Sequence, residues 1–129
     1  MNHKVAIITA ASRGMGAACA RELAEKDYHV VLMSTTDNVL ALADELGGKG
    51  MIGNVTNLDD LQNIVDLAVE SYDQVDAVIN NTGHPPKGEL LEITDADWRQ
   101  AFDLLLMKLS LIHISEPTRP LYITYAFYC

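Results

Sequence analysis

The sequence contains few basic residues, few cysteines and no long apolar run. Its 129 residues include 9 Lys and Arg against 18 Asp and Glu, a formal net charge of −9, which argues against nucleic-acid binding and against a polybasic membrane patch. Two cysteines, Cys19 and Cys129, are too few for a disulfide framework. No stretch approaches the roughly 20 uncharged apolar residues of a membrane span, and the first residues lack a signal-peptide layout. We therefore expect a cytoplasmic protein that binds neither nucleic acid nor membranes.

Apolar residues, by contrast, make up 49% of the chain. That amount suits one domain with one core, and the length is too short for two ordinary domains. Short apolar runs alternate with segments of helical periodicity. The runs predict buried strands at 5–9, 30–33, 51–52 and 75–79, and the periodic segments predict helices at 14–26, 37–46, 56–72 and from about 95. This alternation predicts an α/β fold with a Rossmann-like, doubly wound parallel sheet of strand order 3-2-1-4.

For the first and last predicted helices, the sequence also predicts which residues are buried and which cap the helix. The first has five residues at helical spacing that predict one buried face: Met15, Ala18, Cys19, Leu23 and Ala24. At the start of the last helix, Thr94 and Asp97 resemble a capping box. We expect the ring of Trp98 to anchor that helix to the sheet.

The segment from Thr9 to Gly16 follows the first predicted strand and opens the first helix. In a doubly wound sheet this turn binds a nucleotide phosphate, because the helix N-terminal amides and the helix dipole attract an anion. Glycine lets the ligand approach the backbone and lets the helix pack closely on the strand. The simpler interpretation is a strand–helix turn that needs small residues. The position within a βαβ unit favours the phosphate site.

This turn resembles the Thr-Gly-x-x-x-Gly-x-Gly fingerprint of the short-chain dehydrogenases/reductases. Three further segments match the family in its order. Asn54-Val55 stands for the Asp/Asn-Val pair after the third strand, and Asn80-Asn81-Thr82-Gly83 resembles the Asn-Asn-Ala-Gly motif after the fourth. The loop and helix around Glu92 to Trp98 resemble the family's approach to the next helix. Over about residues 4–107 the sequence is similar to β-ketoacyl-carrier-protein reductases. Ala10 departs from the family's first glycine, a change that a negative φ would tolerate, and Thr82 replaces the motif's alanine.

The resemblance implies a nicotinamide-dinucleotide site. We expect no metal site, because His113 and Glu116 alone are too few ligands to form one. The resemblance assigns the cofactor phosphates to Ser12 and Arg13 with a backbone cradle at 14–16, the adenine to Asn54-Val55, and the ribose near the nicotinamide to Asn81. The predicted cofactor-binding residues are Thr9, Ala11, Ser12, Arg13, Gly14, Met15, Gly16, Thr35, Asn54, Val55, Asn81 and Gly83.

The end of the second predicted strand bears on the choice between NADP and NAD. NAD specificity usually comes from an acidic residue there, which binds the ribose 2′-hydroxyl. This sequence has Ser34 and Thr35 at that place, with no carboxylate until Asp37, and Arg13 adds a cation in the neighbouring turn. These residues favour NADP. NAD is the alternative if Asp37 turns inward.

The family's catalytic acid is a tyrosine whose pKa is lowered by a lysine four residues later, beside a serine that orients the carbonyl. No tyrosine of this sequence has a lysine four residues later, and no lysine follows Lys108. Leu105 stands where the family has a further asparagine. We therefore predict no catalytic residue in this chain. We expect it to hold the N-terminal, cofactor-binding half of a reductase domain, inactive alone, with a sheet truncated after about four strands.

The resemblance also implies properties of a parent protein. It would transfer hydride to reduce a carbonyl, or to oxidise an alcohol, on a small or acyl-thioester substrate, and it would be a homo-oligomer. The alternative is a non-catalytic NADP(H)-binding module whose short length is genuine. A sugar-nucleotide epimerase-like relative is disfavoured, because such proteins usually show Thr-Gly-x-x-Gly-x-x-Gly.

Residues 109–129 do not continue the family pattern, since Pro117 and Pro120 interrupt the helical periodicity. The run at 109–119 resembles the in-frame translation of a transposon-based sequencing-library adapter, and 123–129 resembles an imperfect copy of its far end. We therefore predict a cofactor-binding half at 1–108 and a non-family, artefactual tail at 109–129. The alternative is a divergent C-terminus.

Overall fold

The computed structural model describes residues 3–83, 88–106 and 123–126. Strands and helices alternate along this part of the chain, and every element predicted from the sequence is present. Their bounds are β1 Val5–Thr9, α1 Gly14–Glu25, β2 His29–Ser34, α2 Asn38–Glu45, β3 Lys49–Ile52, α3 Leu58–Tyr72, β4 Ala77–Asn80, α4 Asp95–Leu106 and β5 Ile123–Ala126.

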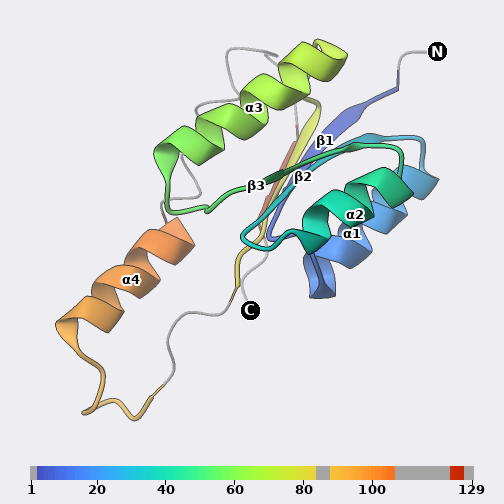
Figure 1. Ribbon diagram of the computed structural model, residues 1–129. Coiled ribbons are helices and arrows are strands. Elements are labelled where there is room, and N and C mark those ends of the chain that lie inside the picture. The colour runs from blue at the N-terminus through green and yellow to red at the C-terminus, as the bar shows by residue number, and fades with distance from the viewer. Residues whose placement is uncertain (1–2, 84–87, 107–122, 127–129) are drawn as a thin grey trace.

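A parallel sheet forms the middle layer of the molecule (Figure 1). Its strand order is β3-β2-β1-β4-β5, so the predicted order 3-2-1-4 is confirmed. The chain moves outward through β1, β2 and β3, then returns to place β4 on the other side of β1. This reversal of direction creates a crevice at the carboxyl ends of β1 and β4, where open α/β sheets bind their ligands.

The sheet has one strand more than the four predicted from the sequence. β5 pairs in parallel with β4, with Ala77 aligned to Ile123 and Asn80 to Ala126. It lies within the segment 109–129, which is predicted from the sequence to be a non-family tail. Isoleucine, threonine and tyrosine favour extended backbone, and the outer edge of β4 offers them unpaired backbone groups. The origin of the segment stays a prediction.

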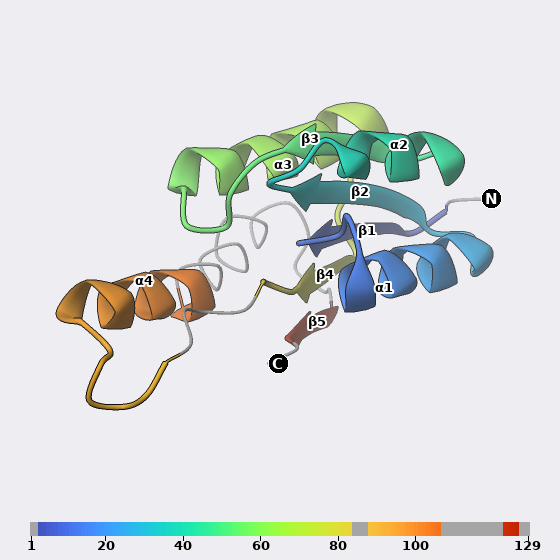
Figure 2. The same cartoon turned by 60° about the horizontal axis from the view of Figure 1, so that its bottom comes forward.

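Helices cover both faces of the sheet, with α1 and α2 on one face and α3 on the other (Figure 2). Successive residues of a strand point to opposite faces. Val5 and Ile7 of β1 therefore pack in one core cluster with residues of α3, whereas Ala6 and Ile8 pack in the other with residues of α1 and α2. Burial on both faces explains why the strands are continuous apolar runs.

The predicted buried face of α1 is partly wrong. The buried residues of this helix are small: Gly16, Ala17 and Ala20. Three residues of the predicted face pack partly buried against the core: Cys19, Leu23 and Ala24. Met15 and Ala18 are exposed instead. Small residues let the helix approach the strand closely, and a pattern of hydrophobic residues does not register a glycine in that role.

The start of α4 confirms the predicted capping box. The Asp97 amide donates to Thr94 Oγ1 at 3.2 Å, and the Thr94 amide donates to Asp97 Oδ2 at 3.0 Å. This amide, and then the Thr94 hydroxyl, hold the pKa of the Asp97 carboxyl below its usual value. The expected anchoring by Trp98 is wrong, because this side chain is 56% exposed; Leu104 packs against the core instead. No helix in the described part of the chain is long and apolar enough to span a membrane.

Candidate nucleotide-binding site

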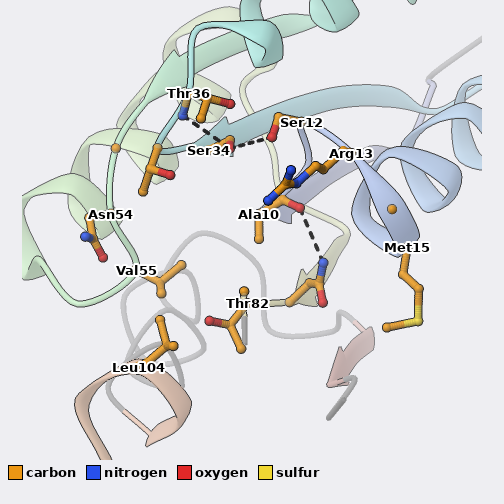
Figure 3. A pocket seen from close by; sticks show the side chains of 15 residues that line it. Ala10, Ser12, Arg13, Met15, Ser34, Thr36, Asn54, Val55, Thr82 and Leu104 are labelled. Carbon is orange, nitrogen blue, oxygen red and sulfur yellow. Dashed lines mark hydrogen bonds between the residues drawn. The ribbon is translucent and has the colours of Figure 1, made fainter. Parts of the chain in front are cut away.

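A pocket of about 630 Å³ lies where the loops after the first four strands meet (Figure 3). The loops after β1 and β2 supply one side of it, and those after β3 and β4 supply the other, with one residue from α4. The lining residues are Ala10, Ser12, Arg13, Gly14, Met15, Ser34, Thr35, Thr36, Gly53, Asn54, Val55, Asn81, Thr82, Gly83 and Leu104.

The structure brings most of the predicted site residues to this pocket. Nine line it: Ser12, Arg13, Gly14, Met15, Thr35, Asn54, Val55, Asn81 and Gly83. Thr9, Ala11 and Gly16 are buried behind the lining and shape it rather than face it. The prediction omitted six lining residues: Ala10, Ser34, Thr36, Gly53, Thr82 and Leu104. Of these, Ser34 was already named for its effect on the choice of cofactor, and Ala10 and Thr82 lie within the quoted motifs. Thr36 and Gly53 adjoin predicted residues in the sequence, whereas Leu104 adjoins none.

The turn that opens α1 has the backbone of an anion site. Arg13 precedes the helix in extended conformation, and its side chain makes no capping hydrogen bond. The first turn of α1 also carries no acidic residue. At α3, by contrast, the Asn57 side chain accepts from two amides, and two acidic residues occupy the first turn. The Arg13 side chain therefore does not cap the positive end of the α1 dipole, and no carboxylate of the first turn opposes an anion there, which suits a phosphate.

Ala10 is strained in this turn. The substitution of the family's first glycine was expected to be tolerated at negative φ, but Ala10 has a φ of +49°. A Cβ in the left-handed region is unfavourable, so alanine is a poorer residue there than glycine. Gly14, at a φ of +61°, has the residue type that its conformation favours.

The end of β2 meets the glycine turn through two hydroxyl groups. Ser34 Oγ donates to Ser12 Oγ at 2.9 Å, and the Thr36 amide donates to Ser34 Oγ at 3.5 Å. Among the lining residues that the structure describes, Arg13 alone is charged. Asp37 is exposed at the start of α2 and is not one of them. This part of the pocket therefore presents hydroxyls and a guanidinium, and no carboxylate, to a ligand.

The loop after β3 is held on both sides. The Gly53 amide donates to the Ser34 carbonyl at 2.9 Å, and the Asn54 amide donates to Asp60 Oδ2 at 2.9 Å. The Asn54 side-chain oxygen accepts from the amide and the hydroxyl of Thr56, at 2.9 and 2.8 Å. These bonds fix the loop that carries Asn54 and Val55, the pair that the resemblance assigns to adenine.

The loop after β4 is tied to β1 by a buried threonine. Thr9 Oγ1 donates to the Asn81 carbonyl at 2.6 Å and accepts from the Asn81 amide at 2.9 Å. Asn81 Nδ2 in turn donates to the Ala10 carbonyl at 3.4 Å (Figure 3). Two buried polar atoms of this loop, Asn81 Oδ1 and Thr82 Oγ1, have no hydrogen-bond partner in the described structure. Asn80, at the end of β4, also has both side-chain polar atoms buried and unpartnered, so such atoms extend beyond the pocket lining.

The described residues of the lining do not include the tyrosine, lysine or histidine side chains used in acid–base catalysis. What the pocket offers is backbone amides, hydroxyls, carboxamides and one guanidinium. Groups of these kinds suit an anionic, hydroxyl-rich ligand, and dinucleotides have that chemistry.

Comparisons with known proteins agree with this geometry. The family described as short chain dehydrogenase matches residues 4–116. The chain is 30% identical over 120 residues to 3-oxoacyl-[acyl-carrier-protein] reductase FabG of Haemophilus influenzae, covering 90% of this chain and 48% of that protein. It is 35% identical over 122 residues to L-fucose dehydrogenase of Mus musculus, covering 88% of this chain and 45% of that protein. The chain thus spans about half the length of the curated relatives it matches.

Solved structures share the fold. Ligand-free aldohexose dehydrogenase of Thermoplasma acidophilum superposes with a TM-score of 0.79 at 24% identity, covering 91% of this chain and 44% of that one. An F189W actinorhodin polyketide ketoreductase with NADPH superposes with a TM-score of 0.80 at 23% identity, covering 88% and 48%. Since the family match extends over most of the sequence, the chain belongs to the short-chain dehydrogenase family.

Proposed function

We propose that this chain forms the cofactor-binding part of an NAD(P)-dependent oxidoreductase and that its pocket binds NADP(H). The observation that carries the proposal is the chemistry around the start of α1. A helix N-terminus that the Arg13 side chain does not cap, the Arg13 guanidinium and the hydroxyls of Ser12 and Ser34 lie on one side of the pocket. A phosphate on the adenosine ribose would meet donors there and no carboxylate.

Each loop of the pocket has a part in this proposal. The α1 N-terminus and Ser12 would hold phosphate groups, Asn54 and Val55 the adenine, and Asn81 the ribose next to the nicotinamide. Bound nicotinamide supplies or accepts the hydride. The related ketoreductase structure with NADPH supports the choice of cofactor, and the FabG relative supports a carbonyl or acyl-thioester substrate for the whole protein.

A non-catalytic NADP(H)-binding module is the second candidate. It is favoured by the sequence, in which no tyrosine is followed by a lysine four residues later. Both candidates require the same pocket to bind the same cofactor. They differ in whether hydride transfer to a ketone accompanies binding, and we expect the 129-residue chain alone to bind without turnover.

Calorimetric titration of the purified chain with NADPH and with NADH tests the proposal. We expect one site per chain and an affinity for NADPH about tenfold tighter than for NADH, since the 2′-phosphate adds charge-assisted hydrogen bonds worth about 1.4 kcal/mol. A Ser12→Asp variant is the control, because its carboxylate would repel the phosphates. Equal affinities, a preference for NADH, or an absence of saturable binding would each contradict the proposal.

A further inference from the structure

The carboxylate of Asp60 joins the start of α3 to the loop after β3. Asp60 lies in the first turn of α3, three residues after the N-cap residue Asn57. In a capping box, a side chain at this place, usually Glu or Gln, accepts from the backbone amide of the N-cap residue. Here the Asn57 amide donates to the Asn54 carbonyl at 3.0 Å instead, and Asp60 Oδ2 accepts from the Asn54 amide at 2.9 Å. The carboxylate therefore holds a residue of the pocket loop.

Asp60 lies behind the pocket lining and not in it. A Cβ built on Gly53 would lie 3.2 Å from both Cβ and Cγ of Asp60, so this side chain packs against the backbone of Gly53. Gly53 and Asn54 both line the pocket, whereas Asp60 does not. Any effect of Asp60 on a ligand in the pocket would therefore act through these two residues.

The other hydrogen bonds of the loop leave the orientation of the Asn54 peptide to Asp60. The Gly53 amide pairs with the Ser34 carbonyl, and the Asn54 side-chain oxygen pairs with the amide and hydroxyl of Thr56. Without the carboxylate, the Asn54 amide would bond to water. A loop that is ordered before a ligand binds avoids the entropy cost of being ordered by it.

The adjacent Asp59 separates this bond from the general effect of an acidic residue at a helix start. Asp59 and Asp60 both lie in the first turn of α3, where a negative charge is favourable. The Asn57 side chain accepts from the amides of both, at 2.9 and 3.3 Å. Among the described residues, the Asp59 carboxylate has no hydrogen-bond partner. The two acids therefore share a charge and a helix turn and differ in the bond to the loop.

We propose that Asp60 is a positioning residue for the cofactor. Its carboxylate fixes the backbone of Asn54 and so holds the loop that receives the adenosine half of NADP(H). The inference rests on the proposed function, which assigns adenine to Asn54 and Val55. Asp60 itself does not touch the cofactor.

Three variants test this role. Asp60→Ala removes the acceptor, Asp60→Asn keeps an acceptor without the charge, and Asp59→Ala removes the same charge one residue away. Affinities of the full chain for NADPH and for 2′,5′-ADP, which contains only the adenosine half, are measured by calorimetry. We expect Asp60→Ala to weaken both by about fivefold, as the loss of one solvent-exposed hydrogen bond implies. Asp60→Asn and Asp59→Ala should stay within about twofold of the unmodified chain.

Hydrogen exchange in the ligand-free chain tests the bond itself. The Asn54 amide proton should exchange about fivefold faster in Asp60→Ala, because it loses its acceptor, and at an unchanged rate in Asp59→Ala. An unchanged rate in Asp60→Ala would show that the carboxylate does not hold the loop, and the role would be wrong.

The binding outcomes separate the two proposals. If the unmodified chain fails to bind 2′,5′-ADP, the proposed function is wrong, and the role of Asp60 is wrong with it. If the chain binds and Asp60→Ala binds equally well, only the role of Asp60 is wrong. Equal losses in Asp60→Ala and Asp60→Asn would assign the effect to charge and overturn the role of the acceptor. Equal losses in Asp59→Ala and Asp60→Ala would assign it to the helix start and also overturn that role.

Discussion

Replacing Gly16 with alanine is expected to lower the free energy of unfolding by about 3 kcal/mol and to abolish cofactor binding. A Cβ at this position would overlap the Ala10 carbonyl oxygen and would lie 2.9 Å from Asn81 Nδ2. The carbonyl belongs to the strained turn and cannot yield without moving it, so the cost is that of overpacking a rigid contact. The same displacement would break the bond between Ala10 and Asn81 at the centre of the pocket.

Gly14→Ala is the matched control for this prediction. Gly14 lies in the same turn and has a φ of +61°, but a Cβ there meets nothing within 4 Å. Alanine at this position should lower the free energy of unfolding by about 1 kcal/mol, because its Cβ is unfavourable in the left-handed backbone region. Urea-induced unfolding of the three proteins makes the comparison. Equal losses for Gly14→Ala and Gly16→Ala would show that close packing at Gly16 does not hold the turn.

Thr35→Asp is expected to weaken NADPH binding on the order of 100-fold and to reverse the preference between the two cofactors. Thr35 is exposed at the end of β2 and lines the pocket beside Ser34. A carboxylate a few ångströms from a doubly charged 2′-phosphate would cost on the order of 3 kcal/mol at the surface of a protein. The same carboxylate can accept from the 2′-hydroxyl of NADH, so NADH affinity should hold or rise.

Thr35→Asn separates charge from shape, because asparagine has the size of aspartate without its charge. We expect it to weaken NADPH binding less than about threefold. Raising the salt concentration should recover part of the affinity lost in Thr35→Asp, since the repulsion is screened. If both variants lost affinity equally, the loss would come from shape, and the 2′-phosphate would not lie beside Thr35.

The sequence predicted the order of elements well because that order depends on local patterns. The apolar runs of β1 and β2 are buried on both faces, and uninterrupted runs indicate such strands directly. The Thr94–Asp97 capping box is also local and was found. The turn at Thr9–Gly16 was predicted correctly, because the strand before it and the helix after it are both evident from local sequence patterns.

Features that depend on the fit between distant segments were missed. The buried face of α1 was partly wrong because Gly16 packs against the Ala10 carbonyl, and a glycine carries no hydrophobic signal. The positive φ of Ala10 follows from the path of the turn and not from the residue type, which disfavours it. Trp98 is exposed because the placement of α4, not its composition, decides which side chains reach the core. The burial of the Thr82 hydroxyl without a hydrogen-bond partner depends on how neighbouring segments pack around it, which the sequence alone does not show.

Mapping 2′,5′-ADP onto the chain by amide chemical shifts tests the central claim most directly. In a ¹⁵N-labelled sample, the largest changes should fall at residues 12–15, Thr35, Asn54 and Val55. The opposite end of the sheet, where the rings of His29 and Tyr72 stack with centroids 4.4 Å apart, should not respond. Largest changes at that end, or no changes at saturating ligand, would contradict the assignment of this pocket to NADP(H).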